Sequence, residues 1–276
     1  MVQADRYVAF LLSALPNLAE KRLYSPGWPL PMPRYAVLDR ALRELRRQPG
    51  IGLEFGVHRG TSLRRAARRL PRRSFYGFDS FTGLPADGRP DWQIDFSLAD
   101  LPSVPRNCRL VRGWFADTIP EFLRGNREPI GFVNIDCDIY SSTKTVLFGL
   151  GERLQPGTIL YFDELINYDT FLWNEMLALF QFLEATGGGV EWLAVHCRVR
   201  CVDEVFALYE KGHYPPWRED VAAGYHRPAA ARLIGDRWDR RVRPKAVDAR
   251  RIDALAARFE AFTTRFKAMR PPAAGG

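Results

Sequence analysis

The sequence predicts an α/β protein with a doubly wound, Rossmann-like sheet of seven strands, the last of which is antiparallel to its neighbour. Short apolar, β-branched or aromatic runs alternate with helical stretches, which is the pattern of a parallel sheet with crossover helices. Glycines follow the first of these runs, and acidic residues end three others. Both features lie where open sheets of this class bind ligands, beyond the carboxyl ends of the strands.

The expected elements follow the chain in order. Two helices are expected within residues 5–48, separated by the proline-rich stretch 25–33. Strands are expected at 51–56, 74–80, 108–113, 130–138, 158–164, 190–195 and 202–209, and helices at 62–70, 116–124, 142–154 and 171–186. Because only six residues separate the last two strands, no crossover helix fits between them, and they are expected to be antiparallel.

Three parts are expected along the chain: an N-terminal helical segment over residues 1–49, a ligand-binding domain over 50–210 and a basic C-terminal extension over 211–276. Residues 80–106 are rich in Pro, Gly and Asp, and a loop of this length usually forms a binding loop or lid. In the extension, one apolar stripe marks an amphipathic helix over 247–269, expected to pack on the protein's own body or across a dimer. The stripe consists of Ile252, Leu255, Phe259, Phe262, Phe266 and Met269.

Composition excludes several classes of protein. The 276 residues carry a formal net charge of +8, but residues 217–276 alone hold 14 Lys or Arg against 7 Asp or Glu. No RRM, KH or zinc-finger pattern accompanies this basic tail, so nucleic-acid binding is not expected. No apolar run approaches the roughly 20 residues of a membrane span. The four cysteines match neither a zinc pair nor a disulfide framework, which favours reduced thiols and a cytoplasmic location.

The turn after the first strand has the pattern of a cofactor site. Glu54, Gly56 and Gly60 form an E-x-G-x-x-x-G turn that leads into a helix near Ser62. Glycines let the backbone approach a ligand closely, and the helix begins with free N–H groups. Asp79 ends the second strand, where an acid can accept ribose hydroxyls. Together these residues indicate a nucleoside-bearing cofactor, although the glycine segment alone also fits a simple tight turn.

Four carboxylates end two other strands. Asp136 and Asp138 end the fourth strand, and Asp163 and Glu164 end the fifth. Because the ends of parallel strands meet at one edge, these groups would repel one another unless a cation or a proton intervened. An oxygen-only set suits Mg²⁺ or Ca²⁺. The alternative for Asp138 is that it caps the helix that follows.

These segments resemble the macrocin-type O-methyltransferases, class I S-adenosylmethionine enzymes that methylate sugar hydroxyls of natural products. The resemblance covers roughly residues 50–209. It depends on LEFGVHRGTSL (53–63), YGFDSFTGLP (76–85), VRGWFADTIP (111–120), NIDCDIYSSTKTVL (134–147), PGTILYFDEL (156–165) and NEMLALFQFL (174–183). It implies S-adenosylmethionine as the cofactor and a divalent metal, usually Mg²⁺.

The resemblance also implies a role for each site residue. The methionine end of the cofactor would lie near Glu54, Gly56, Gly60 and Ser62, its ribose on Asp79 and its adenine beside Gly113 and Trp114. The metal would be held by Asp136, Asp163 and Glu164, and Asp138 would be the catalytic base. Many members of the family have Asp-Asp where this chain has Asp163-Glu164. Tyr168 and Trp173 could stack on a sugar, and core packing is an equal expectation for both.

The function expected from the sequence is therefore metal-dependent O-methylation of a sugar hydroxyl in a glycosylated small molecule or glycan. One alternative is an RNA or other macromolecular methyltransferase whose basic tail holds the substrate. Another is a non-catalytic cofactor-binding scaffold, which would have no need to hold four acids together. Association into a homo-oligomer is left open, and no membrane partner is expected.

Overall fold

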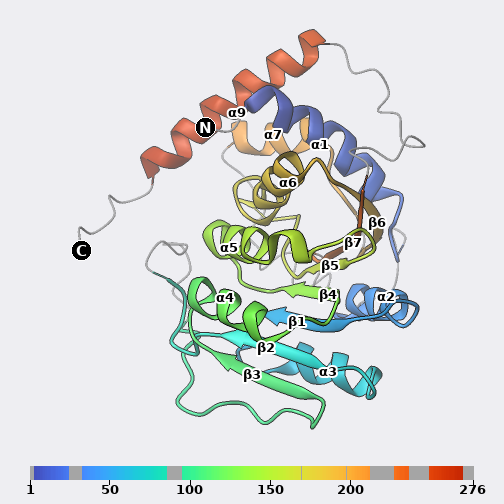
Figure 1. The fold of residues 1–276 in the computed structure, drawn as a ribbon. Coiled ribbons are helices and arrows are strands. Elements are labelled where there is room, and N and C mark those ends of the chain that lie inside the picture. Colours follow the sequence, from blue (N-terminus) through green and yellow to red (C-terminus); the bar gives the residue numbers. More distant parts are fainter. Residues whose placement is uncertain are drawn as a thin grey trace.

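Seven strands in the described part of the chain form one sheet (Figure 1). The computed structural model describes residues 3–24, 33–85, 95–168, 170–196, 198–211, 227–235 and 249–269. The strands are β1 (Ile51–Phe55), β2 (Phe75–Asp79), β3 (Cys108–Arg112), β4 (Ile130–Ile135), β5 (Ile159–Phe162), β6 (Gly189–Val195) and β7 (Ala229–Ile234). Their order is β3-β2-β1-β4-β5-β7-β6, and only the pairings of β7 with β5 and β6 are antiparallel. The predicted doubly wound sheet with an antiparallel last strand is confirmed.

The helices alternate with the strands as expected. They are α1 (Ala4–Ala19), α2 (Ala36–Leu45), α3 (Thr61–Arg69), α4 (Phe115–Gly125), α5 (Tyr140–Leu150), α6 (Glu175–Thr186), α7 (Val202–Glu210) and α9 (Ala249–Met269), with single 3₁₀ turns at Gly151–Arg153 and Phe171–Trp173. All the helices predicted from the sequence are therefore confirmed, with small shifts at their ends. In the described residues, none of the helices combines the length and the apolarity needed to cross a bilayer.

The strand predicted over residues 202–209 is wrong, because this segment forms helix α7. The buried residues Val202, Val205, Phe206 and Tyr209 follow helical rather than alternating spacing. Glu204 also accepts a hydrogen bond from the backbone N–H of Cys201 at 3.1 Å, which satisfies a donor at the start of the helix. The last strand is instead β7, which lies within the segment expected to be a C-terminal extension and is inserted between β5 and β6.

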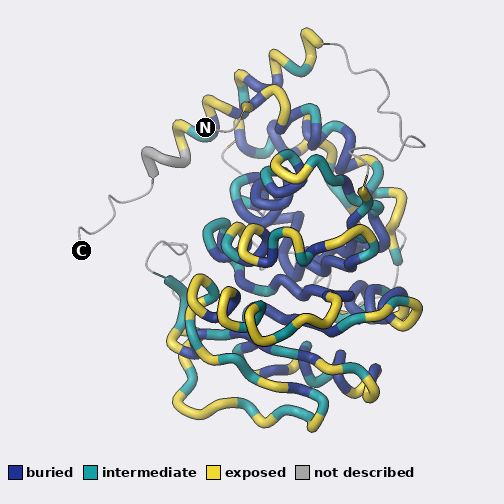
Figure 2. The backbone as a smooth tube through the Cα atoms, viewed as in Figure 1, coloured by how far each residue is buried: buried dark blue, intermediate teal, exposed yellow. Residues whose placement is uncertain are grey.

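Both faces of the sheet are covered by helices, and alternate side chains of each strand point to opposite faces. Phe55, Phe78 and Phe162 pack in the cluster that includes α1, α5 and α6. Phe132 and Tyr161 pack in a second cluster with α2 and α3. The central strands β1, β4 and β5 are accordingly buried throughout, whereas the edge strand β3 is partly exposed (Figure 2).

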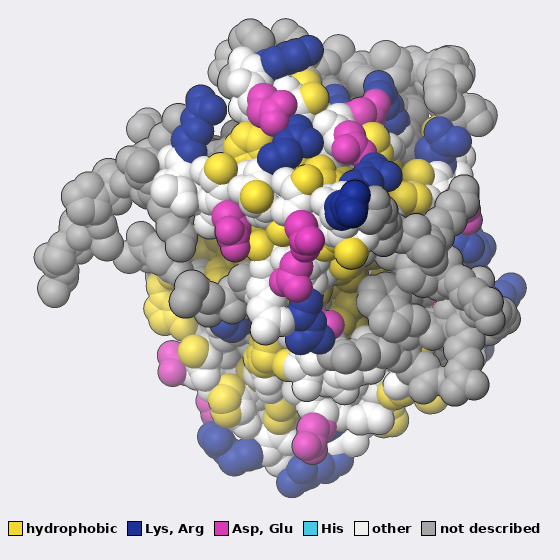
Figure 3. Space-filling model, turned by 90° about the horizontal axis from the view of Figure 1, so that it is seen from above, with side chains coloured by type: hydrophobic (Ala, Val, Ile, Leu, Met, Phe, Trp, Pro, Cys, Tyr) yellow, Lys and Arg dark blue, Asp and Glu magenta, His cyan; other side chains and the backbone are white. Residues whose placement is uncertain are grey.

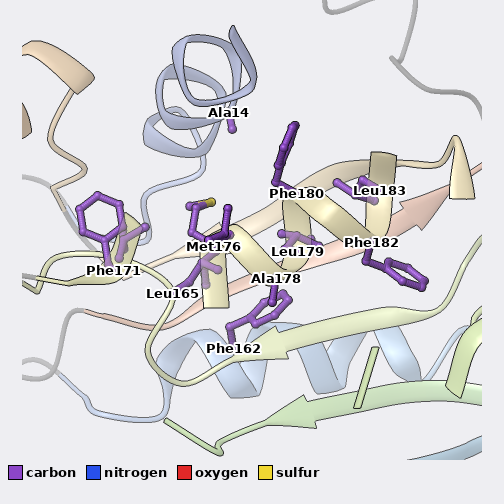
Figure 4. Packing of buried hydrophobic residues seen from close by; sticks show 14 of the residues in the cluster. Ala14, Phe162, Leu165, Phe171, Met176, Ala178, Leu179, Phe180, Phe182 and Leu183 are labelled. Atoms are coloured by element: carbon purple, nitrogen blue, oxygen red, sulfur yellow. The ribbon is translucent and has the colours of Figure 1, made fainter. Parts of the chain in front are cut away.

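Helix α6 supplies much of the core on its side of the sheet. Its residues are almost all buried, in line with a helix that is apolar on most of its surface. Figure 4 shows Ala178 and Leu179 of α6 above Phe162 of β5, with Met176 near Leu165 of the following loop. This packing fixes the loop that leaves β5, where the predicted site residues Asp163, Glu164 and Tyr168 lie.

The apolar stripe of the C-terminal helix packs on the protein's own body, one of the two outcomes predicted. α9 lies against α1 and α7, and Leu255, Phe259 and Phe262 are buried. The ring of Phe259 stacks on that of Trp173 at 5.4 Å between centroids. The side chains of Phe266 and Met269 lie outside the described residues.

Two arginines of α9 form ion pairs with acidic residues of α7. Arg251 pairs with Asp203 at 2.6 Å and Arg258 with Glu210 at 2.8 Å. Figure 3 views this end of the molecule and shows basic and acidic side chains interspersed among the described residues. Part of the positive charge of the C-terminal segment is therefore neutralised by acidic residues of α7.

The predicted lid over residues 80–106 is only partly described, because residues 86–94 lie outside the described ranges. The described parts contain no helix and no strand of the sheet, but Thr82 and Ser97 form an isolated bridge between the part before residues 86–94 and the part after them. Ser80, Pro85 and Phe96 of this segment line the cavity considered next. A binding role for the lid stays a prediction.

Candidate cofactor and substrate site

A cavity of about 720 Å³ lies at the carboxyl ends of β1, β2, β4 and β5. This is the position at which open α/β sheets bind ligands, and the size suits a small-molecule site. Most of the residues singled out in the sequence line it: Gly56, Ser62, Asp79, Trp114, Asp136, Asp138, Asp163 and Glu164. His58 also lines it, and its ring meets that of Phe96 edge-on at 5.6 Å.

Strand register explains why residues distant in sequence meet here. Phe55 of β1 pairs with Ile135 of β4, and Ile135 pairs with Phe162 of β5. The next residue on each strand therefore falls in one row across the sheet edge. The backbone N–H of Asp136 donates to the carbonyl of Phe55 at 2.9 Å, and that of Asp163 donates to the carbonyl of Ile135 at 3.0 Å.

Gly56 is held tightly against the backbone of the neighbouring strand. Its φ is +90°, and a Cβ atom at this position would lie 1.7 Å from the carbonyl oxygen of Asp136. Only glycine combines this conformation with this close approach. The backbone of the glycine turn therefore lies in direct contact with the backbone of the carboxylate row, at Gly56 and Asp136.

Asp79 organises the same turn through its carboxylate. Oδ2 accepts hydrogen bonds from the backbone N–H groups of Val57 at 2.8 Å and His58 at 2.7 Å. Oδ1 accepts one from Phe81 at 2.7 Å. A carboxylate has about four acceptor positions, so Asp79 retains capacity for one further donor.

Glu54 lies behind the cavity instead of lining it. Its side chain is buried and accepts hydrogen bonds from Ser62 Oγ at 2.9 Å and from Asn134 Nδ2 at 2.8 Å. Asn134 is its pairing partner across β1 and β4. Desolvation by burial raises the pKa of Glu54 from 4.5 to about 7, against the opposing effect of the two hydrogen bonds. Through these two hydrogen bonds, Glu54 of β1 connects the strand to α3 and to β4 beside the turn.

The raised pKa of Glu54 predicts a pH-dependent penalty on stability. Below about pH 4.5 the group is protonated in both the folded and the unfolded state, so it costs nothing. As pH rises to about 7, the unfolded state releases the proton first, and the free energy of unfolding falls by up to about 3 kcal/mol. Glu54→Gln also sets an amide N–H₂ against one of the two donors at every pH, so the test is the difference: its melting temperature relative to the wild type should be higher at pH 8 than at pH 4.5. Glu121→Gln, on the exposed surface of α4, is the control. A gain that is the same at both pH values would contradict the assignment.

The carboxylates at the sheet edge lie close enough to disfavour one another's ionisation. The pKa of Asp136 is raised well above its ordinary value, first by burial and then by the charges of Asp163 and Asp138. The pKa of Glu175 at the start of α6 is also raised, by burial and then by Glu164, Asp138 and Asp163. Such a cluster favours binding of a proton or a cation.

Strained backbone is concentrated around the cavity. His58, Phe81 and Asp138 have φ values of +44°, +57° and +63°, although none is glycine. They follow the ends of β1, β2 and β4, respectively. This backbone conformation is unfavourable for residues other than glycine. It occurs often at functional sites, where the surrounding structure maintains it.

The three predicted metal ligands do not have equivalent environments. Asp136 and Asp163 both line the cavity, and Tyr161 donates a hydrogen bond to Asp163 Oδ1 at 2.9 Å. Glu164 Oε1, however, accepts a hydrogen bond from Arg227 Nη1 at 2.7 Å in a buried ion pair. In the described residues, no group of three or more His, Cys, Asp or Glu side chains is arranged to hold a metal ion. The two aspartates fit a hard cation, and Glu164 does not.

Four other predicted residues do not line the cavity. Gly60 begins α3 in the left-handed conformation, and Gly113 donates its N–H to the carbonyl of Asp79 at 2.9 Å, so both shape the backbone nearby. Tyr168 is buried beneath the guanidinium of Arg227. Trp173 donates from Nε1 to Thr263 Oγ1 of α9 at 2.9 Å. The two aromatic side chains therefore pack against other parts of the protein.

The structure adds residues to the site that the sequence did not indicate. Arg34 and Tyr35 precede α2 and line the cavity, as does Arg227, which precedes β7. Burial raises the pKa of Tyr35, and the charges of Asp163 and Asp136 raise it further, although Arg34 opposes the shift. Arg34 and Tyr35 follow a proline-rich stretch, and no motif marks them. Arg227 lies 63 residues from Glu164 and precedes a strand that the sequence did not predict.

Comparisons with known proteins locate a family match over the same segment. A family model described as a methyltransferase domain matches residues 53–165. A tetracenomycin-C 4'-O-methyltransferase of Streptomyces olivaceus, named for its 2,3-dimethoxy-α-L-rhamnosyl substrate, is 30% identical over 141 residues. That match spans 42% of this chain and 53% of the relative, so the chain matches about half of the relative's length.

Solved structures of methyltransferases are similar over more of the chain but at low identity. The calicheamicin methyltransferase CalS11 is 22% identical with a TM-score of 0.49, over 81% of this chain and 91% of that one. The O-methyltransferase NovP is 16% identical with a TM-score of 0.44, over 69% and 94%. The glycine turn and the strand-end acids described above lie within the segment that the family model matches. Over residues 53–165, the chain is therefore similar to a methyltransferase domain.

Proposed function

We propose that the protein is an S-adenosylmethionine-dependent O-methyltransferase that acts on a hydroxyl of a sugar in a glycosylated small molecule or glycan. The observation that carries this proposal is that one cavity is lined by both a glycine turn and a row of carboxylates. The turn suits a nucleoside-bearing cofactor, and the carboxylates suit a hydroxyl that must lose a proton. The rhamnosyl substrate named for the Streptomyces olivaceus relative supports the choice of a sugar.

The cofactor would lie along the turn between β1 and α3. Its methionine end would lie near Gly56 and Ser62, and its ribose would donate to the remaining acceptor position of Asp79. Trp114 is 44% exposed and lines the cavity, so its ring is accessible for stacking on adenine. Glu54, Gly60 and Gly113 would contribute by holding the backbone of this site. When bound, S-adenosylmethionine supplies an electrophilic methyl group.

The acceptor hydroxyl would meet the carboxylate row at the ends of β4 and β5. As its oxygen gains the methyl group, it must release a proton, and we assign Asp138 as the general base that takes it. Asp138 lines the cavity two residues after Asp136, beyond the end of β4. A divalent cation, Mg²⁺ by the resemblance, would be held by Asp136 and Asp163 and would lower the pKa of the hydroxyl.

Substitution of Asp79 tests the cofactor site. Asp79→Asn places an amide N–H₂ against backbone N–H donors that the carboxylate now accepts, and it weakens the proposed ribose contact. We expect binding of S-adenosylhomocysteine, measured by calorimetry, to weaken by roughly tenfold or more, because charged hydrogen bonds contribute about 1.5–3 kcal/mol each. Asp95→Asn is a matched control, since Asp95 caps the backbone of Ser97 outside the cavity. Unchanged affinity in Asp79→Asn would place the ribose elsewhere.

Methyl transfer with and without a chelator tests the function and the metal together. We expect labelled methyl groups from S-adenosylmethionine to reach rhamnosides and related glycosides. Exhaustive EDTA treatment should abolish transfer while leaving S-adenosylhomocysteine binding intact, because the carboxylates and the glycine turn occupy adjacent parts of the cavity. Full activity after chelation would refute metal dependence. Cofactor binding without transfer to any glycoside would contradict the choice of acceptor.

The structure favours this function over an RNA methyltransferase. Among the described residues, five carboxylates line the cavity against three arginines, Arg34, Arg59 and Arg227, and Arg227 is paired with Glu164, so the cavity offers a polyanion no continuous basic surface. On α9, two arginines already pair with acids of α7. A scaffold without activity would have no need for the strained backbone and clustered acids around the cavity. A cytoplasmic location is part of the proposal, and Cys108, Cys137 and Cys201 are free thiols.

A further inference from the structure

One side of the protein carries a dense set of exposed arginines. Residues 40–73 contain eleven arginines, no lysine and two acidic residues, Glu44 and Glu54, which are both buried. The exposed charged side chains of this stretch are therefore all positive. Seven exposed arginines, at the ends of α2 and α3 and before β3, form what we call the arginine surface: Arg43, Arg46, Arg47, Arg68, Arg69, Arg72 and Arg106.

Hydrogen bonds join the three segments that carry the arginine surface. Arg46 Nη2 donates to the backbone carbonyl of Arg69 at 3.2 Å, which connects the end of α2 to the end of α3. Asn107 Nδ2, directly before β3, donates to the backbone carbonyls of Ala67 at 3.2 Å and Arg73 at 2.9 Å. The seven arginines therefore lie on neighbouring segments and form one continuous surface.

Few of these charges are neutralised within the protein. Asp39 pairs with Arg69 at 2.8 Å, and Glu44 lies 4.0 Å from Arg47. Like charges at this density repel one another, and an anionic partner would relieve that repulsion. In the part of the chain that the structure describes, no acidic side chain forms an ion pair with the other five arginines of the surface: Arg43, Arg46, Arg68, Arg72 and Arg106.

The arginine surface lies at the opposite end of the sheet from the cavity. α3 begins at Thr61, after the carboxyl end of β1, and ends at Arg69, while Arg106 precedes the amino end of β3. A strand of five residues such as β1 separates the two ends by about 17 Å. In Figure 1 the arrows of β1 and β2 accordingly point away from this end. A partner bound here would leave the cavity open.

Asp39 shows how an arginine on this side of the protein binds a carboxylate. Arg65 of α3 donates from Nε and Nη2 to the two carboxylate oxygens of Asp39 in α2, each at 2.7 Å. The planar guanidinium matches a carboxylate in this bidentate geometry. The exposed arginines at the ends of the same two helices present this group to solvent. Arginine is also enriched at interfaces between proteins.

The arginine surface lacks the side chains that other anionic partners use. Single-stranded nucleic acids stack on aromatic rings, and membrane surfaces take up exposed apolar side chains. In the described ranges, the exposed large hydrophobic residues are Leu101, Trp114 and Phe148, and none of them belongs to α2, α3 or the turns that follow them. We propose that the arginine surface is a docking site for an acidic surface of a partner protein, held by arginine–carboxylate pairs. This role goes beyond the reaction in the cavity and does not depend on it.

A labelled helical peptide of alanine and glutamate, with glutamates four residues apart, serves as the probe in fluorescence anisotropy at low salt. The wild type should bind it, and binding should weaken as salt is added. Arg43→Gln/Arg68→Gln/Arg72→Gln should weaken binding by about fivefold or more, because each exposed ion pair contributes modestly and three are removed. Arg22→Gln/Lys211→Gln/Arg265→Gln is the matched control, since it removes the same charge from exposed residues on or after α1, α7 and α9, and its affinity should stay within about twofold.

An equal loss in the two triple variants would overturn the proposal, because binding would then follow net charge alone. Failure of the wild type to bind the peptide at low salt would overturn it as well. A duplex RNA and phosphatidylserine vesicles are titrated in the same way. Tighter binding of either one than of the peptide, with the larger loss in the first variant, would assign the surface to nucleic acid or to a membrane instead. Thermal unfolding of both variants confirms that they are folded, which is expected because the substituted side chains are exposed.

Discussion

Replacing Asp138 with asparagine is expected to lower kcat by about 10²–10⁴-fold, the usual contribution of a positioned general base. Asp138 lines the cavity and has a φ of +63°, a conformation that asparagine adopts as readily as aspartate. The substitution therefore keeps the backbone and the shape of the side chain. It removes the ability to accept a proton from the sugar hydroxyl.

Steady-state kinetics with S-adenosylmethionine and a glycoside, together with calorimetry of S-adenosylhomocysteine, check this expectation. Cofactor affinity should hardly change, because the turn at the end of β1 is untouched. Asp117→Asn, on the exposed first turn of α4, is the matched control and should keep its kcat. A near-normal kcat in Asp138→Asn would reject the base assignment, and the N-cap residue of α5 is Ile139. Loss of Mn²⁺ binding would instead identify Asp138 as a ligand.

The fold was predictable from the sequence wherever an apolar run is buried on both sides of the sheet. β1, β4 and β5 are such strands, and glycine, proline or acidic residues mark their ends. β7 could not be found in this way, because its alanine-rich sequence has weak strand propensity, and it forms a strand by pairing with β5 and β6. The prediction of a strand at 202–209 is wrong because Val202, Val205, Phe206 and Tyr209 recur at helical spacing, which the sequence already shows.

The candidate site was predictable where it depends on strand ends. Asp136 and Asp163 fall in one row because parallel register places the next residue of each strand side by side. Local pattern could not show that Glu54 points behind the cavity, since its direction is set by Asn134 on a neighbouring strand. Nor could it show the partner of Glu164, because Arg227 reaches the site only through the path of the chain into β7.

Gly56→Ala is expected to have the largest effect on the folded state. The new Cβ would lie 1.7 Å from the carbonyl oxygen of Asp136, and the residue would have to keep a φ of +90°. Overpacking typically costs about 1–3 kcal/mol or more, and the strained backbone adds roughly 1 kcal/mol. Because the obstructing atom is backbone, either the turn or β4 must move. We therefore expect a lower melting temperature and loss of S-adenosylhomocysteine binding together.

Substitutions at two other glycines distinguish the cost of a positive φ from the cost of a steric clash. Gly83 has a φ of +97°, and no atom of the described residues lies within 4 Å of a Cβ built there, so Gly83→Ala should show only the backbone cost, about 1 kcal/mol. Gly125, at the end of α4, has no positive φ and no such neighbour in the described part of the chain, and Gly125→Ala should leave stability unchanged or slightly higher. Thermal unfolding of the three variants should rank Gly56→Ala far below Gly83→Ala. Gly56→Ala could instead match Gly83→Ala in stability and still bind the cofactor. In that case neither the stability of the fold nor cofactor binding would depend on the close approach of Gly56 to Asp136, and the glycine turn would not be coupled to the carboxylate row.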